Sequence, residues 1–359
     1  MNSIIAVHIK ANLLRPLLRF MKAAVLYKPA KMEENPLKIE QLEIPKIEDD
    51  EVLIRIKACG VCRSNLHMIE GDWLDLGVPA KLPIIPGHEI VGIVEKVGKE
   101  VRNVKVGDRV GVQPLYSTCG ACEYCISGRE NLCNMAEITG ETVDGGYAEY
   151  MKAKAAHVYE VPSNLKDEEA APLFCPGVTA YRAVMLSEIS PAKSVAIFGI
   201  GGVGHLAIQF AKLYGAKVIA VSADEQKLRI AKELGADLTI SSKSDVVNQI
   251  ISLGYVDSSI VFAPSDEAVF QATQVTKKGG IIVIGVRANL NDFRFANEQI
   301  IKGSVIGTRV DMMNVLKIAS QGKLKVYYEV YQLEEINSVL KKLKRREIRE
   351  RAVLKFSAE

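Results

Sequence analysis

The pattern of apolar and polar residues divides the chain into two kinds of region. In residues 51–61 (EVLIRIKACGV), 89–98 (EIVGIVEKVG) and 108–115 (DRVGVQPL), apolar and polar positions alternate. Successive side chains of a strand point to opposite faces, so each run predicts a half-buried strand. The run MKAAVLY predicts a first strand at 21–27, and residues 21 to about 174 are therefore predicted to be rich in strands.

Residues 192–305 follow a different pattern, in which short apolar runs alternate with helical periodicity. The runs 192–199 and 216–223 predict buried strands, and 201–215 and 224–235 predict helices. Strands that alternate with helices form βαβ units around a parallel sheet, so this region predicts a doubly wound, Rossmann-type α/β fold. The other predicted elements are strands at 237–240, 258–264, 279–286, 302–308, 325–332 and 351–356, and helices at 312–322 and 333–347.

Composition and charge are typical of a globular protein with more than one core. The 359 residues are 48% hydrophobic, and the formal net charge is +3, which gives no footprint of a nucleic-acid or membrane partner. Residues 1–20 carry Lys10, Arg15 and Arg19 and no acid, and polar residues keep their apolar runs shorter than a signal peptide or a membrane span. We predict that they precede the natural start at Met21; an organellar targeting peptide is the alternative.

Four of the seven cysteines lie within fifteen residues, in the run CGACEYCISGRENLC. Clustering and the odd count favour metal binding in a reducing, cytoplasmic setting over a disulfide framework. An all-sulfur shell closes a tetrahedral ion and leaves no position for water or substrate, which is typical of structural zinc. A disulfide pair and an iron–sulfur cluster are the alternatives. The four residues are Cys119, Cys122, Cys125 and Cys133.

A glycine-rich turn joins the first predicted strand of the α/β region to its first helix. The turn has the pattern GxGxxG, which is meaningful because it follows a predicted strand and opens a predicted helix. The first glycine allows the tight turn, the second lets a pyrophosphate approach, and the last lets helix and strand pack closely. The turn therefore predicts dinucleotide binding. Its residues are Gly199, Ile200, Gly201, Gly202, Val203 and Gly204.

The residue that ends the second strand of such a fold bears on the choice between NAD and NADP. An acid there accepts hydrogen bonds from the adenosine ribose and repels a 2′-phosphate, but in this chain the position is Ser222. Lys227 suits either cofactor, whereas Asp224 and Glu225 disfavour added negative charge. The balance predicts NAD(P)(H) with a narrow preference for NADP(H).

A second set of candidate metal ligands is scattered along the chain. Cys62, His88 and Cys175 together offer two thiolates and one imidazole. On zinc, such a set leaves the fourth position open for water or an alcohol oxygen. Taken singly, each residue fits core packing as well; the nearby dinucleotide turn and four-cysteine run favour a catalytic zinc.

In combination these motifs resemble those of the zinc-containing medium-chain alcohol dehydrogenases, in a short, microbial-type form. The run GHEIVGIVEKVGKEV matches the family's zinc signature, and the four-cysteine lobe, the GxGGxG turn and the closing RAVL match as well. The resemblance implies a GroES-like, β-rich catalytic domain made of residues 21–174 and 306–359, with a structural-zinc lobe at 117–135. A Rossmann domain at 175–305 is inserted between the two parts. The signature residues are Gly87, His88, Glu89, Gly92, Gly98 and Val101.

The resemblance also implies roles for individual residues. Glu89 resembles the carboxylate that stands behind the catalytic zinc, and Ser64 and His67 resemble a relay that removes the substrate proton. Arg63 and Arg351 resemble contacts to the cofactor pyrophosphate. The residues that resemble contacts to the nicotinamide ring are Thr179 and Val203.

Three positions depart from the family pattern. Asn65 stands where the family usually has an Asp that hydrogen-bonds the zinc-ligating histidine; we expect its amide oxygen to accept that bond and the zinc affinity to fall modestly. Cys59 has no family role and is expected to be a small buried residue. Pro114 replaces a tryptophan of the substrate pocket, whereas Trp73 resembles another wall of it, which together suggest a roomier cavity.

The resemblance implies an enzyme that transfers hydride between a primary or secondary alcohol, or its aldehyde or ketone, and a nicotinamide cofactor. The expected cofactors are two zinc ions per chain and NAD(P)(H), and the expected assembly is a homotetramer in the cytoplasm, without nucleic acid or membrane. The alternatives are a polyol or sugar dehydrogenase of the same family and a non-enzymatic dinucleotide-binding protein.

Overall fold

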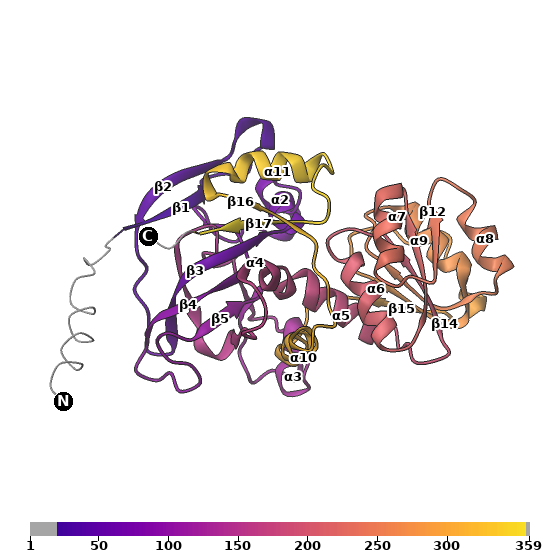
Figure 1. Ribbon diagram of the computed structural model, residues 1–359, viewed down its shortest axis with the longest axis horizontal. Helices are drawn as coiled ribbons and strands as arrows, with labels where there is room; N and C mark the ends of the chain where they lie inside the picture. Colours follow the sequence, from indigo (N-terminus) through magenta and orange to yellow (C-terminus); the bar gives the residue numbers. More distant parts are fainter. Residues whose placement is uncertain (1–19, 357–359) are drawn as a thin grey trace, which may run out of the picture.

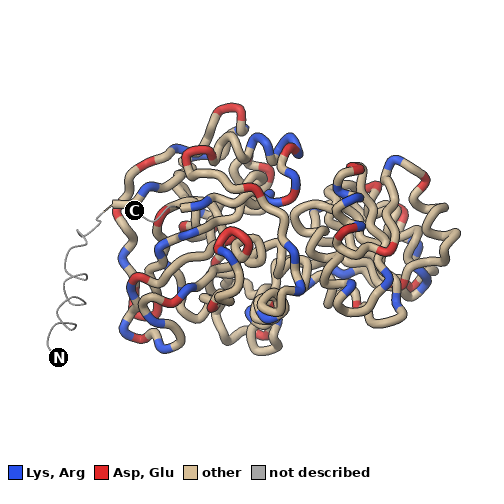
Figure 2. Tube along the Cα trace, viewed as in Figure 1, with Lys and Arg blue, Asp and Glu red and all other residues tan. Residues whose placement is uncertain are grey.

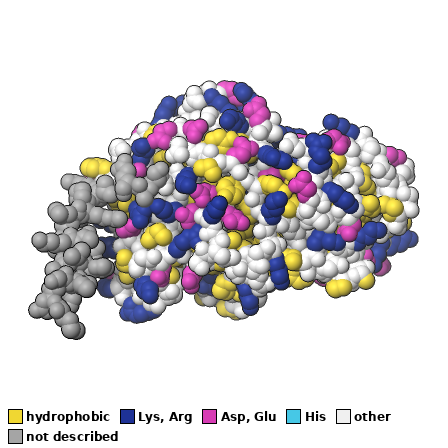
Figure 3. Space-filling view, viewed as in Figure 1, with side chains coloured by type: hydrophobic (Ala, Val, Ile, Leu, Met, Phe, Trp, Pro, Cys, Tyr) yellow, Lys and Arg dark blue, Asp and Glu magenta, His cyan; other side chains and the backbone are white. Residues whose placement is uncertain are grey.

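The computed structural model describes residues 20–356, which form two lobes side by side (Figure 1). The predicted extension therefore lies outside the described residues, apart from Phe20, which begins the first strand. None of the described helices is long and apolar enough to cross a membrane. Basic and acidic side chains are interspersed along both lobes (Figure 2) and over the face shown in Figure 3.

The first lobe is built around a seven-stranded sheet of order β16-β17-β3-β4-β5-β9, with β8 paired to β3. Strands from the start and the end of the chain meet in it, because β17 pairs antiparallel with β3. Two small antiparallel sheets, β1-β2 and β6-β7, complete the strands of this lobe. Their bounds are β1 Phe20–Leu26, β2 Leu37–Glu43, β3 Glu51–Val61, β4 Glu89–Val97, β5 Arg109–Val112, β6 Leu115–Ser117, β7 Glu137–Ile138, β8 Tyr150–Lys154, β9 Val158–Glu160, β16 Tyr328–Tyr331 and β17 Arg351–Lys355.

The second lobe is a six-stranded parallel sheet of order β12-β11-β10-β13-β14-β15, as the alternation of strands and helices predicted. The strand order reverses next to β10, which is where a doubly wound sheet opens a ligand crevice. The bounds are β10 Ser194–Phe198, β11 Lys217–Ser222, β12 Leu238–Ser241, β13 Val256–Val261, β14 Thr276–Ile284 and β15 Ile300–Gly303. Its helices are α6 Gly204–Leu213, α7 Glu225–Glu233, α8 Val246–Ser252 and α9 Asp266–Val275.

One predicted strand is misplaced, since β15 occupies Ile300–Gly303 and not 302–308. Ile306 has a positive φ of 49°, which ends extended backbone. Thr308 is already the N-cap of α10 (Arg309–Ser320): its side chain accepts a hydrogen bond from the Asp311 backbone, and the Asp311 carboxylate accepts one from the Thr308 backbone. This capping box fixes the helix start and removes these residues from the sheet.

Helices connect the two lobes and cover the first one. Helix α5 lies at the junction in Figure 1, and its Val178 belongs to one apolar core with Val91 of β4 and Ile197 of β10. That shared core holds the lobes together. The remaining helices are α2 Arg63–Glu70, α3 Glu123–Ile126, α4 Asp167–Ala170, α5 Pro176–Leu186 and α11 Ile336–Lys344, and the 3-10 turns are η1 Met32–Glu34, η2 Leu74–Leu76, η3 Glu130–Leu132, η4 Ala155–His157, η5 Ala171–Phe174, η6 Phe295–Asn297 and η7 Leu333–Glu335.

Candidate active site and metal centres

The three scattered ligand candidates converge at the junction of the lobes. Cys62 follows β3 directly and is the N-cap of α2, and His88 precedes β4. Because β3 and β4 are antiparallel, with Gly60 opposite Glu89, the end of one strand meets the start of the other. Cys175 joins them from the other direction, as the residue between η5 and α5.

The donor atoms of this group are close enough to share one ion. The ligand atoms of Cys62, His88, Glu89 and Cys175 all lie within 4.8 Å of one another. The Sγ atoms of Cys62 and Cys175 are 3.7 Å apart, which is too long for a disulfide bond. The hydrogen bond between these two side chains holds the pKa of Cys62 well below its usual value and raises that of Cys175.

Glu89 is fully buried beside the three ligand candidates. Its Oε1 accepts a hydrogen bond from Nη2 of Arg351, and its Oε2 is buried with no hydrogen-bond partner. Burial raises the pKa of Glu89 to about 7, against the pull of the Arg351 charge. Gly60 makes this arrangement possible, because a Cβ at that position would collide with the Glu89 carboxylate.

This donor set fits zinc on its own chemistry. Two cysteines and one histidine are the soft and borderline donors that zinc prefers, and three protein ligands leave a position open. The Oε2 of Glu89 is buried without a hydrogen-bond partner, and a nearby cation would satisfy such an oxygen. Cys62, His88 and Cys175 are therefore the residues that would hold a catalytic zinc.

The contact between Asn65 and His88 differs from the expected one. The amide nitrogen Nδ2 of Asn65 faces Nδ1 of His88 at 3.4 Å, while its oxygen accepts a hydrogen bond from the Tyr147 hydroxyl at 3.1 Å. Sequence reasoning expected the oxygen to face His88. It missed Tyr147, a fully buried side chain that lies 82 residues away in the sequence and carries no local signal.

The two relay candidates have different surroundings. The Ser64 hydroxyl donates to Sγ of Cys62 at 3.1 Å and lies 3.3 Å from Nε2 of His88, so it adjoins the ligand group. His67 lies farther along α2, where Nδ1 is 2.8 Å from an Asp72 carboxylate oxygen. Its ring stacks on Trp73 with 5.4 Å between centroids.

The two pocket candidates lie on different elements. Trp73 is the N-cap residue of η2 and is partly exposed. Pro114 is buried between β5 and β6, and its carbonyl accepts a hydrogen bond from the Thr139 backbone at 2.8 Å. None of these contacts tests whether Trp73 and Pro114 line the same pocket, so that role stays a prediction. Cys59 is fully buried, as expected for a packing residue.

The glycine-rich turn has the geometry of a phosphate site. Gly199 has a φ of 95°, and a Cβ on Gly204 would collide with its carbonyl oxygen, so both positions require glycine. Two cations flank the turn: a Cβ on Gly202 would lie 2.6 Å from Nη1 of Arg351, and one on Gly201 would lie 3.8 Å from Nζ of Lys227. The start of α6, with its unpaired N–H groups, therefore faces positive side chains that suit a pyrophosphate.

The remaining cofactor candidates surround this turn. Val203 is the N-cap residue of α6, and Thr179 stands one turn into α5, where its backbone donates to the Cys175 carbonyl at 2.9 Å. Arg63 is half-buried; its Nε is buried without a partner, which leaves a donor for an anion. Ser222 ends β11, and its Oγ accepts from the Asp224 backbone at 3.3 Å.

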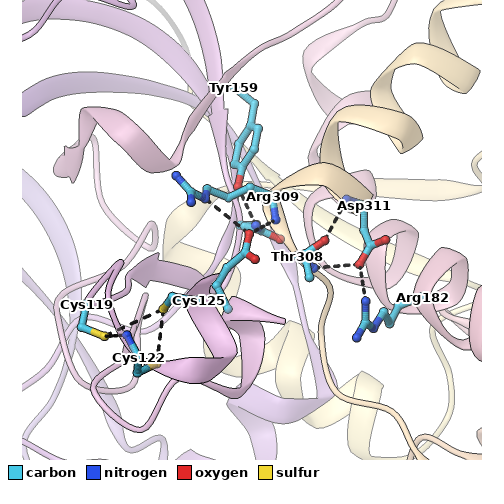
Figure 4. A network of polar contacts seen from close by, with 10 residues as sticks. Cys119, Cys122, Cys125, Tyr159, Arg182, Thr308, Arg309 and Asp311 are labelled. Atoms are coloured by element: carbon cyan, nitrogen blue, oxygen red, sulfur yellow. Dashed lines mark hydrogen bonds and ion pairs between the residues drawn. The ribbon is translucent and has the colours of Figure 1, made fainter. Parts of the chain in front are cut away.

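The four-cysteine lobe forms a second compact sulfur cluster. The Sγ atoms of Cys119, Cys122, Cys125 and Cys133 lie within 4.8 Å of one another, and the pairs in hydrogen-bond contact are 3.6 to 3.9 Å apart. Figure 4 shows three of them, Cys119, Cys122 and Cys125. These separations exclude a disulfide in this state, since that bond is about 2.05 Å long. Backbone N–H groups of Ala121 and Cys122 lower the pKa of Cys119 to about 6, which favours the thiolate that binds metal.

Two families match the chain over most of its length. Residues 48–163 match the family described as "Alcohol dehydrogenase GroES-like domain", and residues 202–321 match "Zinc-binding dehydrogenase". An alcohol dehydrogenase of Geobacillus stearothermophilus is 46% identical over 343 residues, which are 93% of this chain and 99% of that protein. One from a Moraxella strain is 37% identical over 94% of this chain and its own full length.

Solved structures agree with the sequence matches. The alcohol dehydrogenase of Aeropyrum pernix superposes with a TM-score of 0.86 at 35% identity, covering 93% of this chain and 100% of its own. A cobalt- and zinc-bound alcohol dehydrogenase of Pyrobaculum aerophilum gives 0.84 at 29% identity, over 94% and 100%. A structure described as an NAD-dependent alcohol dehydrogenase gives 0.85 at 29% identity, also over 94% and 100%.

Fold and site together define a zinc-dependent dehydrogenase with a GroES-like and a Rossmann-type domain. The chain belongs to the zinc-containing medium-chain alcohol dehydrogenase family. As a member, it is an enzyme that transfers hydride between an alcohol, or its aldehyde or ketone, and a nicotinamide cofactor, and it uses zinc. The matches favour neither a polyol or sugar dehydrogenase nor a non-enzymatic dinucleotide-binding protein.

Proposed function

We propose that alcohol oxidation and carbonyl reduction take place where Cys62, His88 and Cys175 meet. The observation that carries this proposal is the convergence of their donor atoms, together with an unpartnered oxygen of Glu89. When bound there, zinc supplies a Lewis acid that lowers the pKa of an alcohol oxygen, and the nicotinamide accepts or returns the hydride. The side chains around the zinc site and the cofactor are proposed to move the proton and to hold the substrate and the cofactor.

We propose that Ser64 takes the substrate proton. Its Oγ lies 3.1 Å from Sγ of Cys62 and 3.3 Å from Nε2 of His88, which supports a contact with a substrate oxygen held by the same group. His67 lies about one turn along α2 and is held by Asp72, which positions the imidazole to pass the proton towards solvent. Trp73, stacked on His67, and Pro114 are proposed to line the substrate pocket.

The cofactor is proposed to lie across the start of α6, with its pyrophosphate held by cationic side chains. Arg351 and Lys227 flank Gly202 and Gly201, and Arg63 offers an unpartnered guanidinium nitrogen. Thr179 and Val203, at the starts of α5 and α6, are the proposed nicotinamide contacts. Binding across the junction would hold the alcohol carbon close to the nicotinamide carbon that accepts the hydride. Such close, aligned placement of two reactants lowers the barrier to reaction.

The proposal includes a narrow preference for NADP(H). Ser222 has no carboxylate to repel a 2′-phosphate. The Asp224 carboxylate is occupied at the start of α7, where it accepts from the backbones of Gln226 and Lys227. Lys227 then remains to attract the phosphate.

The proposal assigns two zinc ions to each chain, with a structural one in the four-cysteine lobe at 117–135. It keeps the division of the chain into a catalytic domain at 21–174 and 306–359 and a Rossmann domain at 175–305. The free cysteines of the described residues favour a reducing, cytoplasmic location.

We also propose a homotetramer. Strand β15 is an edge of the parallel sheet, and the exposed apolar residues Phe295, Ile300 and Val305 lie in or beside it. An exposed strand edge with apolar side chains is a ready surface for pairing with a second copy. Light scattering coupled to size exclusion tests the number of chains, and a monomer at micromolar concentration contradicts the proposal.

Two ligand substitutions and a zinc count test the site assignment. Cys62→Ala and His88→Ala should leave a folded protein that contains one zinc per chain in place of two and has little turnover. Circular dichroism, elemental analysis and the absorbance of the reduced cofactor with a panel of alcohols measure these three properties. Unfolding of both variants would make the site structural, and full turnover would remove it from catalysis.

A further inference from the structure

A buried carboxylate joins the four-cysteine lobe to the chain that returns from the parallel sheet. Glu130, in η3, lies three residues before Cys133 and is only 5% exposed. Its Oε1 accepts a hydrogen bond from the backbone nitrogen of Arg309 at 2.9 Å and lies 3.4 Å from the Nε of the same residue. Figure 4 shows Arg309 between the sulfur cluster and the Thr308–Asp311 cap.

This contact is made at the positive end of α10. Arg309 is the first residue of that helix, where backbone N–H groups are unpaired and a carboxylate is stabilising. Burial acts to raise the pKa of Glu130, but hydrogen bonds from backbone N–H groups, the largest from Arg309, together with the charge of Arg309 outweigh burial, so the pKa is lowered and the side chain is charged. A second bond, from Nδ2 of Asn131 to the Val305 carbonyl at 3.0 Å, ties the lobe to the segment just before the helix.

Helix α10 is in turn fixed to α5. Nη1 of Arg182 donates to the Asp311 carboxylate at 3.1 Å, and Nδ2 of Asn314 donates to the Tyr181 hydroxyl at 3.3 Å. Gly307 packs directly on Val178 of α5, with no room for a side chain. Three separate contacts therefore fix the start of α10 against the body of α5.

Helix α5 begins at a ligand of the other metal site. Cys175 is its N-cap residue, and the Thr179 backbone donates to the Cys175 carbonyl at 2.9 Å, within the first turn. A shift or tilt of α5 therefore displaces Sγ of Cys175 relative to Cys62 and His88, which belong to the β-rich lobe.

We infer that Glu130 is a positioning residue that couples the four-cysteine lobe to the placement of Cys175, through α10 and α5. The inference rests on the proposed zinc site at Cys62, His88 and Cys175. Glu130 lies between two of the lobe's ligand candidates, Cys125 and Cys133, so a metal held by these cysteines would also fix the position at which Glu130 meets α10. Loss of the lobe metal would therefore loosen the second site without any direct contact between the two.

The test uses the full-length protein loaded with cobalt, whose absorption differs between a four-thiolate site and a site of two thiolates and one imidazole. A chelator is added, and the rate of metal loss is recorded separately for the two sites. Glu130→Ala should lose metal from the Cys62–His88–Cys175 site faster, by up to about tenfold, which is the lower end of the effect of removing a group that hydrogen-bonds a ligand directly. Glu130→Gln keeps an acceptor oxygen and should lie between Glu130→Ala and the wild type. Glu123→Gln, at an exposed glutamate of the same lobe, is the matched control and should behave as the wild type.

The outcomes separate this inference from the proposed function. Equal rates for the Cys62–His88–Cys175 site in Glu130→Ala and Glu123→Gln overturn the inference, even if the four-cysteine site empties faster, because Glu130 then serves its own lobe alone. If Glu130→Ala does not fold, the rates of metal loss from Glu130→Gln and Asn131→Ala are compared with that from Glu123→Gln, and equal rates again overturn the inference. A wild type that binds only one cobalt per chain rejects the proposed function itself, whatever the variants do.

Discussion

The guanidinium group of Arg351 joins the two halves of the candidate site. One of its terminal nitrogens donates to Glu89, beside the cluster of Cys62, His88 and Cys175, and the other lies against Gly202 in the phosphate-binding turn. Arg351 is 4% exposed and Glu89 is fully buried, so the pair is shielded from water. The candidate metal site and the candidate dinucleotide site therefore share one charge.

Removal of that charge should harm stability and cofactor binding together. Arg351→Met should lower the free energy of unfolding by about 3 to 5 kcal/mol, because it leaves the buried Glu89 without its partner. It should also raise the Kd of the nicotinamide cofactor. Urea unfolding and fluorescence titration measure the two effects.

The exposed neighbour Arg349 provides the control, and Arg349→Met should change neither quantity appreciably. The double variant Arg351→Met with Glu89→Gln should recover part of the lost stability, since the unpaired charge is then gone. A stable Arg351→Met protein with unaltered cofactor affinity contradicts this account of the pair.

Asn65→Asp should strengthen metal binding at the candidate catalytic site. The amide of Asn65 now presents nitrogen to Nδ1 of His88, whereas a carboxylate would accept a hydrogen bond from that nitrogen and make the imidazole a better ligand. We expect loss of zinc to a chelator to slow by about tenfold, at the lower end of the usual range for such partners. Tyr147→Phe is a useful comparison, because it frees the Asn65 oxygen without adding charge. Faster zinc loss from Asn65→Asp than from the wild type would refute the prediction.

The stability of the protein should fall as the pH drops from about 6.5 to about 4, in part through His157. This imidazole is 4% exposed, neither ring nitrogen has a hydrogen-bond partner, and burial together with the charge of Arg309 lowers its pKa to about 4. The unfolded chain takes up a proton near pH 6.5 and the folded chain only near pH 4. The contribution of His157 is therefore complete above pH 6.5 and is lost below it, on the order of 3 kcal/mol in total.

Chemical unfolding of wild type and His157→Leu between pH 4 and pH 7.5 measures this contribution. The variant has no group to titrate at this position, so its stability should depend less steeply on pH within that window. His205 is fully buried with a similarly lowered pKa and remains in both proteins, so a residual slope is expected. Parallel profiles for the two proteins would show that His157 does not contribute.

Ser222→Asp should shift the cofactor preference from NADP(H) towards NAD(H). A carboxylate at the end of β11 accepts from the ribose hydroxyls and repels a 2′-phosphate. The ratio of kcat/KM for NADP to that for NAD should fall by at least about tenfold, which corresponds to about 1.4 kcal/mol. Steady-state kinetics with both cofactors and one alcohol give the ratio. An unchanged ratio would place the choice of cofactor elsewhere.

Much of the fold could be predicted from local pattern, because the buried side of a regular strand or helix requires apolar residues at a fixed spacing in the sequence. The strand β3, with its alternating positions, and the helix α6, which opens at the glycine-rich turn, are examples. The predicted strand at 302–308 was wrong because Thr308 and Asp311 form a cap, and capping outweighs the β-branched composition of that run. Helices α8 and α9, which were not predicted individually, alternate with the later strands.

The ligand candidates could be predicted because metal chemistry restricts the residue types and because the family motifs fix their positions. The contacts that orient them could not. Glu130 and Arg309 are 179 residues apart, Glu89 and Arg351 are 262 apart, and each pair meets only after the chain has returned from the parallel sheet. No periodicity or short motif carries that information, which arises from packing.

Gly60 carries a consequence for the evolution of this enzyme. Every single-base change of a glycine codon that alters the amino acid adds a Cβ, and at this position a Cβ strikes the Glu89 carboxylate. Any substitution of residue 60 therefore requires the Glu89 side chain to move or to be replaced. A position that binds neither ion nor coenzyme should thus accept few substitutions in a saturation mutagenesis survey.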